Sequence, residues 1–254
     1  MERAQKKHWC LSLTMLSIAI FITPLACAES AEILIQRNEL TDKGENNVDF
    51  SANLSKTSNK SDLKGRSVFQ ALGEYSYGFA DHWEAGFKLP IYRVDGNWYG
   101  SGLIGELKYV APHDDQGLYW GVEIETGYTS TFNEKRRWGL EIVPIFGYLS
   151  DRWHVTANPG LSITSAGDDR GTVIFEPSGK ISHQFAQKRS IGLEYFIEAG
   201  SLKSLLPRKE RNEVAYLVLD TKVGKSTINI GLGRGMTDVS PRWVAKLIVD
   251  LEFD

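Results

Sequence analysis

Apolar and polar residues alternate along much of the chain, and the alternation is clearest at residues 242–253. Every second position of that segment is apolar, from Trp243 to Phe253, whereas the positions between them are mostly charged. A β-strand directs successive side chains to opposite faces, so this strand has one apolar and one polar face. The terminal rings are about ten residues apart, the length that a tilted strand needs to cross a bilayer with an aromatic residue at each boundary. The segment predicts a membrane-spanning strand.

The same two-residue period recurs in eleven earlier segments, which gives twelve predicted strands. The connections alternate between long polar segments and tight turns, as in bacterial barrels with long outer loops and short periplasmic turns. An even number of strands brings both termini to the periplasmic side. The predicted fold class is therefore all-β, a single antiparallel transmembrane β-barrel of about 12 strands with periplasmic N- and C-termini. The segments are 48–54, 68–77, 83–91, 103–111, 120–128, 138–148, 153–161, 173–181, 191–199, 215–223, 228–232 and 242–253.

Tryptophan and tyrosine residues fall near the ends of the predicted strands, on the apolar face. Both residue types prefer the headgroup level of a membrane, whereas the core aromatics of a soluble sandwich would lie mid-strand as often as at strand ends. The position of these rings favours a membrane. The predicted interface aromatics are Trp83, Trp120, Trp138, Trp153, Trp243, Tyr77, Tyr128 and Tyr148.

Four prolines argue against unbroken strands. Pro90, Pro144, Pro159 and Pro177 fall within predicted strands, and a closed barrel has no edge at which a missing N–H is harmless. We expect them to mark bulges or strand ends. Three of them lie in consecutive strands.

The N-terminus has the organisation of a secretory leader. A positively charged start is followed by an apolar stretch at residues 11–25 and by small residues at Ala26-Cys27-Ala28. We predict that residues 1–28 are a cleaved signal peptide, that residues 29–47 are a polar periplasmic lead-in, and that residues 48–254 form the barrel. A lipoprotein anchored through Cys27 is the weaker alternative, because Pro24 stands where an aliphatic residue is expected.

Composition excludes several other classes. Past the leader no apolar run is long enough for a transmembrane helix, and Lys and Arg form no block that would indicate nucleic-acid binding. Both cysteines, Cys10 and Cys27, lie in the leader, so the mature chain has no disulfide and no thiolate metal site. We expect no cofactor and no metal. The expected partners are outer-membrane lipid, the outer-membrane assembly machinery and, for an open barrel, a small-molecule solute.

The polar face of the predicted strands carries both signs of charge, and acids outnumber bases twelve to five. Charges at this density must pair across strands or stay hydrated. Two interpretations remain open: an aqueous, weakly cation-favouring pore, or a salt-bridge network that fills the lumen. The predicted lumen-lining residues are Glu74, Glu84, Lys88, Glu106, Lys108, Glu123, Glu125, Glu141, Glu176, Lys180, Glu194, Glu198, Asp220, Lys222, Lys246, Asp250 and Glu252.

No catalytic constellation can be assigned. His154 and Asn158 share the inward face of one predicted strand. A serine–histidine–asparagine arrangement is not recognisable around Ser162, Ser182-His183 or Asn158. We expect a protein that is not an enzyme, with a lipid-active enzyme as the less favoured alternative.

Residues 73–90, GEYSYGFADHWEAGFKLP, followed by 105–109, GELKY, resemble a family of Gram-negative outer-membrane barrels described as MetA-pathway phenol-degradation or transporter-like proteins. The matching features are Tyr77-Gly78, Asp81, Trp83 and Leu89-Pro90. The resemblance implies a barrel in the outer membrane, although the solute of the family is poorly defined. Asp254 departs from the usual aromatic terminus. We predict a passive channel or transport-associated protein for small polar or aromatic solutes, with a structural or adhesive barrel as the alternative.

Overall fold

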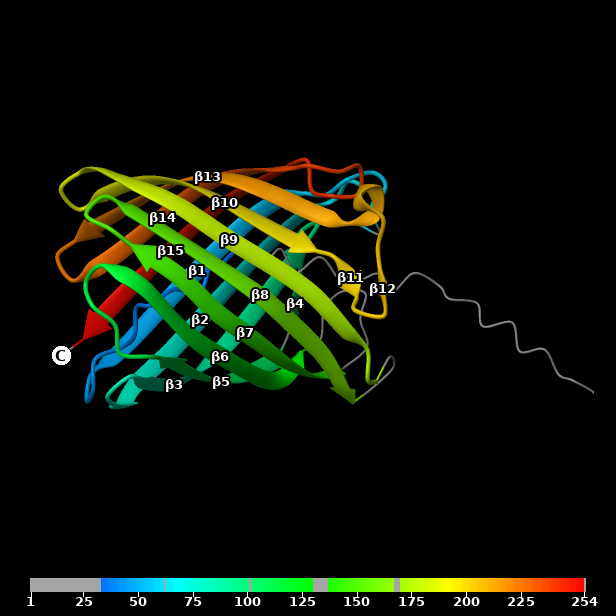
Figure 1. The fold of residues 1–254 in the computed structure, drawn as a ribbon. Coiled ribbons are helices and arrows are strands. Elements are labelled where there is room, and N and C mark those ends of the chain that lie inside the picture. The colour runs from blue at the N-terminus through cyan, green and yellow to red at the C-terminus, as the bar shows by residue number, and fades with distance from the viewer. Residues whose placement is uncertain (1–32, 62, 101, 130–136, 167–169, 254) are drawn as a thin grey trace, which may run out of the picture.

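Twelve long strands form one closed antiparallel barrel in the computed structural model, which describes residues 33–61, 63–100, 102–129, 137–166 and 170–253 (Figure 1). Each strand pairs with its neighbours along the chain, and β15 pairs with β1 to close the ring. The predicted closed antiparallel β-barrel of about 12 strands is confirmed. The barrel strands are β1 (Asn46–Lys56), β2 (Ser67–Ala80), β3 (Trp83–Val94), β5 (Gly102–Val110), β6 (Gly117–Thr129), β7 (Arg137–Leu149), β8 (Trp153–Ala166), β9 (Val173–Ala186), β10 (Arg189–Glu198), β13 (Asn212–Val223), β14 (Ser226–Gly235) and β15 (Trp243–Phe253).

The two ends of the barrel differ in their connections. At the turn end, where β15 finishes, two residues join β13 to β14, and Gly224 adopts φ +67°, as tight hairpins require. At the loop end, the connections are long and carry three short strands, β4 (Asn97–Gly100), β11 (Gly200–Ser201) and β12 (Ser204–Leu205), and the 3-10 helix η1 (Arg208–Glu210). β4 lies in the connection between the predicted strands 83–91 and 103–111, where it pairs with the end of β3 and extends that strand into a hairpin. Within the described ranges no helix is long and apolar enough to cross a membrane.

The outer surface of the barrel carries a continuous set of apolar side chains. Leu193 and Leu232 expose 59% and 58% of their surface, and both belong to the rows expected to face lipid. Exposed apolar area of this extent marks an interaction surface, and on a closed barrel it suits a bilayer. Seven of the eight predicted interface aromatics are exposed, and Tyr128 is half-buried. Near the turn end, the ring of Tyr109 lies 4.7 Å from that of Trp83 and 5.8 Å from that of Trp120.

The prolines occupy two kinds of position. Pro90 is buried on the inner wall opposite Leu72. Pro159 lies directly opposite Pro177, and Pro144 and Pro159 fall where the β7–β8 register is interrupted, between the pairs Ile142↔Leu161 and Phe146↔Ala157. Where the hydrogen-bond ladder between two strands is interrupted, no backbone N–H is required from proline. This explains how prolines in consecutive strands are tolerated.

Candidate functional site

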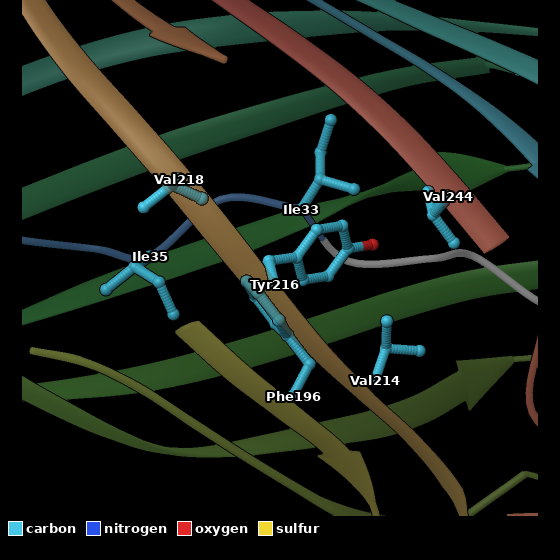
Figure 2. Packing of buried hydrophobic residues seen from close by; sticks show 7 residues of the cluster. All are labelled: Ile33, Ile35, Phe196, Val214, Tyr216, Val218 and Val244. Carbon is cyan, nitrogen blue, oxygen red and sulfur yellow. The ribbon is translucent and has the colours of Figure 1, made fainter. Parts of the chain in front are cut away.

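Residues 33–41, which precede β1, line the cavities inside the barrel, and residues 42–44 are exposed at its turn end. Ile33 and Ile35 are each only 6% exposed. Figure 2 shows them packed against side chains of three strands: Phe196 of β10, Val214, Tyr216 and Val218 of β13, and Val244 of β15. We call residues 33–45 the N-terminal segment. The range 29–47 is predicted as a polar periplasmic lead-in, and its short apolar stretch at 33–35 meets an apolar part of the inner wall.

Polar contacts attach the N-terminal segment to the wall along its length. The side chain of Asn158 accepts a hydrogen bond from the Gln36 backbone N–H (3.0 Å) and donates one to the Gln36 carbonyl (2.9 Å). Lys246 Nζ donates to the Ile33 carbonyl at 2.6 Å, and the Thr41 N–H donates to Glu84 Oε2 at 2.7 Å. These contacts satisfy backbone groups of residues 33–41, whereas the segment pairs with β2 only at its end, through the bridge between Lys43 and Gly78. The segment is therefore a fixed part of the lumen.

Lys88 of β3 is the centre of one buried ionic cluster. Its Nζ lies 2.8 Å from Glu106, 2.9 Å from Glu123, 2.5 Å from Glu125 and 3.6 Å from Glu74. Ligand atoms of Glu106, Glu123 and Glu125 lie within 4.8 Å of one another, a spacing that would suit a metal ion. The ammonium of Lys88 already occupies the middle of this trio. One base shared by four acids still leaves the cluster short of positive charge.

A second ionic cluster lies between β9, β10, β13 and β15. Lys180 Nζ is 3.0 Å from Glu194 and 2.9 Å from Asp220, and Lys246 pairs with the other oxygen of Glu194. The Lys246 ammonium also lies 5.0 Å from the ring centre of Tyr216, a cation–π contact. Asn229 donates to Asp220 at 2.7 Å. Here acids and bases are balanced, so this cluster stiffens the wall and anchors the N-terminal segment.

The strand register places like charges side by side. Glu106, Glu125 and Glu141 are direct cross-strand neighbours on β5, β6 and β7, and Asp250, Asp49 and Glu74 are neighbours on β15, β1 and β2. Like charges directly opposite one another destabilise a sheet. Both rows therefore favour cations in the lumen.

The N-terminal segment adds an ion pair of its own. Arg37 Nη1 lies 3.3 Å from Glu39 Oε1. Desolvation alone would raise the pKa of Glu39, but Arg37 together with smaller electrostatic and backbone contributions holds the pKa below its usual value. Burial likewise opposes the charge of Arg37, yet Glu39 and more distant acids leave its pKa raised. Both side chains are charged at neutral pH.

The N-terminal segment separates two cavities. The larger, of about 280 Å³, opens toward the loop end, and its lining is mixed: apolar side chains such as Ile104 and Phe196 face carboxylates such as Glu141 and Glu176. The smaller, of about 110 Å³, lies toward the turn end, between residues 34–41 of the segment and a largely acidic part of the wall. A solute entering from the loop end therefore meets the N-terminal segment before it reaches the turn end.

The predicted lumen residues mostly lie on the inner wall. Eight are buried: Glu84, Lys88, Glu106, Lys108, Glu123, Lys180, Glu194 and Lys246. Seven are half-buried: Glu74, Glu125, Glu141, Glu176, Glu198, Asp220 and Asp250. Lys222 is exposed at the turn end, and the side chain of Glu252 falls outside the described residues. Their role as lumen lining stays a prediction.

Sequence reasoning missed two groups of inner-wall residues. The first is polar, and Asn47, Asp49 and Tyr119 belong to it. These residues occupy positions that alternate with the apolar residues of their strands, and that alternation could have identified them. The second is apolar, and it comprises Tyr92, Val143, Ile145, Tyr216, Val218 and Val244. The available signal was the stretch at 214–219, which is apolar on both faces.

The histidine considered for catalysis has other partners. His154 Nε2 lies 2.7 Å from the Tyr119 hydroxyl and 3.3 Å from Thr156 Oγ1. The ring of His183 stacks against that of Trp153, with centroids 4.5 Å apart. These contacts link strands and do not assemble a serine with either histidine.

The fold is similar to that of several solved outer-membrane proteins. The COG4313 outer membrane channel from Pseudomonas putida F1 aligns over 87% of this chain and 100% of its own, with a TM-score of 0.65 and 14% identity. The KdgM porin in complex with disordered oligogalacturonate aligns over 82% and 99% (TM-score 0.55, 12% identity), and the NanC porin over 81% and 100% (TM-score 0.55, 12% identity). No protein-family model and no curated protein matches the sequence. At these identities the likeness shows the fold, and the resemblance to MetA-pathway barrels stays a prediction.

Proposed function

We propose that this protein is an outer-membrane channel for small solutes whose passage is controlled by its own N-terminal segment. The observation that carries the proposal is the loop-end cavity of about 280 Å³, which ends on that segment. A closed barrel with an apolar exterior and a cavity open at one end is suited to transport. Similar barrels are named channels or porins, which supports the same function. In this proposal the turn end and both termini face the periplasm, after a signal peptide at 1–28 has been removed.

The lining of the loop-end cavity indicates the solute class. Ile104, Tyr92 and Phe196 offer apolar and aromatic contacts, whereas Glu141 and Ser162 offer polar ones. We infer small polar or aromatic solutes, with a preference for neutral or cationic species because of the glutamate row on β5–β7.

A structural or adhesive barrel is the second candidate. The observation that favours it is the pair of ionic clusters around Lys88 and Glu194, which cross-link the inner wall. If these clusters close the lumen by themselves, removing the N-terminal segment will leave the barrel silent. The channel proposal expects the opposite.

Planar-bilayer recording distinguishes the two candidates. The mature chain and a variant lacking residues 29–41 are refolded into the same detergent and reconstituted separately. A channel gated by the segment gives larger and more frequent current steps after the deletion, with a cation preference that Glu141→Gln reduces. Folded barrels that pass no current with or without the segment would overturn the channel proposal.

A further inference from the structure

The ionic cluster around Lys88 lies where the two cavities meet. Lys88 and Glu125 line the loop-end cavity, whereas Glu74 and Glu123 line the turn-end cavity. A carboxylate oxygen of each of these glutamates lies within 3.6 Å of the Lys88 Nζ. A cation that moves between the two cavities along this side of the wall therefore meets the Lys88 cluster.

Three of the carboxylates around Lys88 have the arrangement of a cation site. Among the described residues, Glu106, Glu123 and Glu125 are the one group of acids whose ligand atoms lie close enough together to hold a metal ion, within 4.8 Å of one another. We call them the glutamate trio. Gly86 leaves room for one of them, because a Cβ there would lie 2.3 Å from Glu106 Oε1. That oxygen and Glu123 Oε2 are buried and accept no hydrogen bond from the described residues. Spacing, room and unused acceptors each point to a cationic ligand.

The cation that the structure shows in this site is tethered to the chain. The Nζ of Lys88 lies 2.8, 2.9 and 2.5 Å from the three members of the glutamate trio, and the lysine is only 4% exposed. Lys108, which also lies on the inner wall, pairs with Glu84 instead, at 3.6 Å. Among the described residues no second base pairs with the trio. One ammonium thus holds together carboxylates whose combined charge exceeds its own.

We propose that Lys88 determines which cations pass this junction: it admits monovalent cations and keeps divalent cations such as Ca²⁺ out of the glutamate trio. The inference rests on the channel function proposed above. Ca²⁺ requires six to eight oxygen ligands, and the oxygens of the trio are already engaged by an ammonium that repels a divalent ion more strongly than a monovalent one. Without Lys88 the trio would retain Ca²⁺, whereas conduction needs binding weak enough for the ion to leave.

Calcium titration of refolded protein tests the site without any measurement of current. Refolding from inclusion bodies in detergent removes lipopolysaccharide, which binds Ca²⁺ itself, and ionic strength is held constant with NaCl. Lys88→Met should bind one Ca²⁺ saturably by calorimetry. At about ten times the half-saturating concentration, its Tm should rise by about 3–5 °C relative to EGTA. The parent should show neither the heat nor the rise in Tm.

Further variants locate the binding. Adding Glu125→Gln to Lys88→Met removes one charged ligand and should raise the half-saturating Ca²⁺ concentration roughly tenfold. Lys180→Met is the matched control, because Lys180 is also almost fully buried and pairs with two acids, but no acid trio with metal-ligand spacing surrounds it among the described residues. It should give no Ca²⁺ response. Lys88→Gln combined with Glu74→Gln serves if Lys88→Met does not fold, since the pair keeps the trio and the net charge of the cluster.

Bilayer recording tests the consequence for conduction. Ca²⁺ at the half-saturating concentration of Lys88→Met should occupy half of the sites, so it should roughly halve the Na⁺ current through that variant. The same Ca²⁺ concentration should leave the Na⁺ current through the parent unchanged.

The outcomes distinguish this inference from the proposed function. The inference is overturned if neither Lys88→Met nor its double-variant substitute shows a Ca²⁺-dependent change in heat or Tm, or if the parent or Lys180→Met responds as strongly as Lys88→Met. Ca²⁺ that binds Lys88→Met without reducing its Na⁺ current also overturns it. Barrels that pass no current with or without residues 29–41 refute the channel function instead, and the calcium titration then still decides whether Lys88 keeps divalent cations out of the glutamate trio.

Discussion

Replacing both Ile33 and Ile35 by alanine should release the N-terminal segment from the barrel wall. Both side chains are almost fully buried against β10, β13 and β15, and they are the apolar contacts of the segment with the buried cluster in Figure 2. Each Ile→Ala change in a packed site costs about 2–5 kcal/mol. The lower end of this range applies, because the partly hydrated lumen can relax around the smaller side chains. The double variant is then expected to destabilise the seated segment by roughly 4 kcal/mol.

A loss of that size raises the unseated fraction about a thousandfold. Two assays report it. Channel recordings should show a higher open probability, and a cysteine at Gln36, in a mature chain without other cysteines, should react faster with a membrane-impermeant thiol reagent. Gln36 suits the probe because it is held through its backbone groups, not its side chain.

The control makes the same two Ile→Ala substitutions on the outer surface of the barrel instead of in the N-terminal segment. Ile191→Ala with Ile230→Ala removes the same atoms from the outer surface, where the two side chains are 46% and 50% exposed. It should leave open probability and labelling rate at Gln36→Cys unchanged. Labelling and conductance of the Ile33/Ile35 variant equal to those of the parent, in a barrel that circular dichroism shows to be folded, would refute the role assigned to the N-terminal segment.

Three further changes test individual contacts. Asn158→Ala removes both hydrogen bonds to the Gln36 backbone, which should cost roughly 1–3 kcal/mol and raise open probability about tenfold in bilayer recordings. Lys88→Met leaves four buried acids without their ammonium and should lower the free energy of unfolding in urea by roughly 3–5 kcal/mol, whereas the exposed Lys222→Met should change it by about 0.5 kcal/mol or less. The pKa of Glu39 is depressed in the folded state, so its stabilisation is complete above an ordinary value of about 4.3 and is lost as pH falls through the lower folded pKa. Thiol labelling of the segment should therefore increase only in acid, and Glu39→Gln should flatten that pH dependence. A pH profile of labelling that is the same in Glu39→Gln and in the parent would contradict the role given to Glu39.

The barrel itself could be predicted because lipid imposes a strict rule on sequence. Every second residue of a spanning strand must be apolar, and the resulting period of two is readable in most of the twelve strands, whereas residues 214–219 of β13 are apolar on both faces. The hairpin formed by β4 escaped prediction, since Asn97–Gly100 is short and solvent-exposed positions obey no such rule. The boundaries of β1 and β2 were likewise displaced outward by one to three residues, where strands extend beyond the apolar row.

The position of the N-terminal segment was hidden for a different reason. Three apolar residues, 33–35, are too few to show a period, and their partners lie on strands far along the chain. One clue was present: Val214, Tyr216 and Val218 give β13 an apolar inner face. An apolar face inside a polar lumen needs an apolar partner, and the short stretch at 33–35 was the candidate closest in sequence to the barrel.

The juxtaposition of Asp49 and Asp250 shows what alternation leaves undetermined. A slip of two residues between β1 and β15 would keep every side chain on its face and would separate the two acids. It would also break the pairing that runs in register over all eleven residues of β1, Asn46 to Lys56, and the lost hydrogen bonds are expensive where lipid offers no substitute. Hydrogen bonding and ring closure therefore set the register, and the electrostatic cost falls on the inner wall.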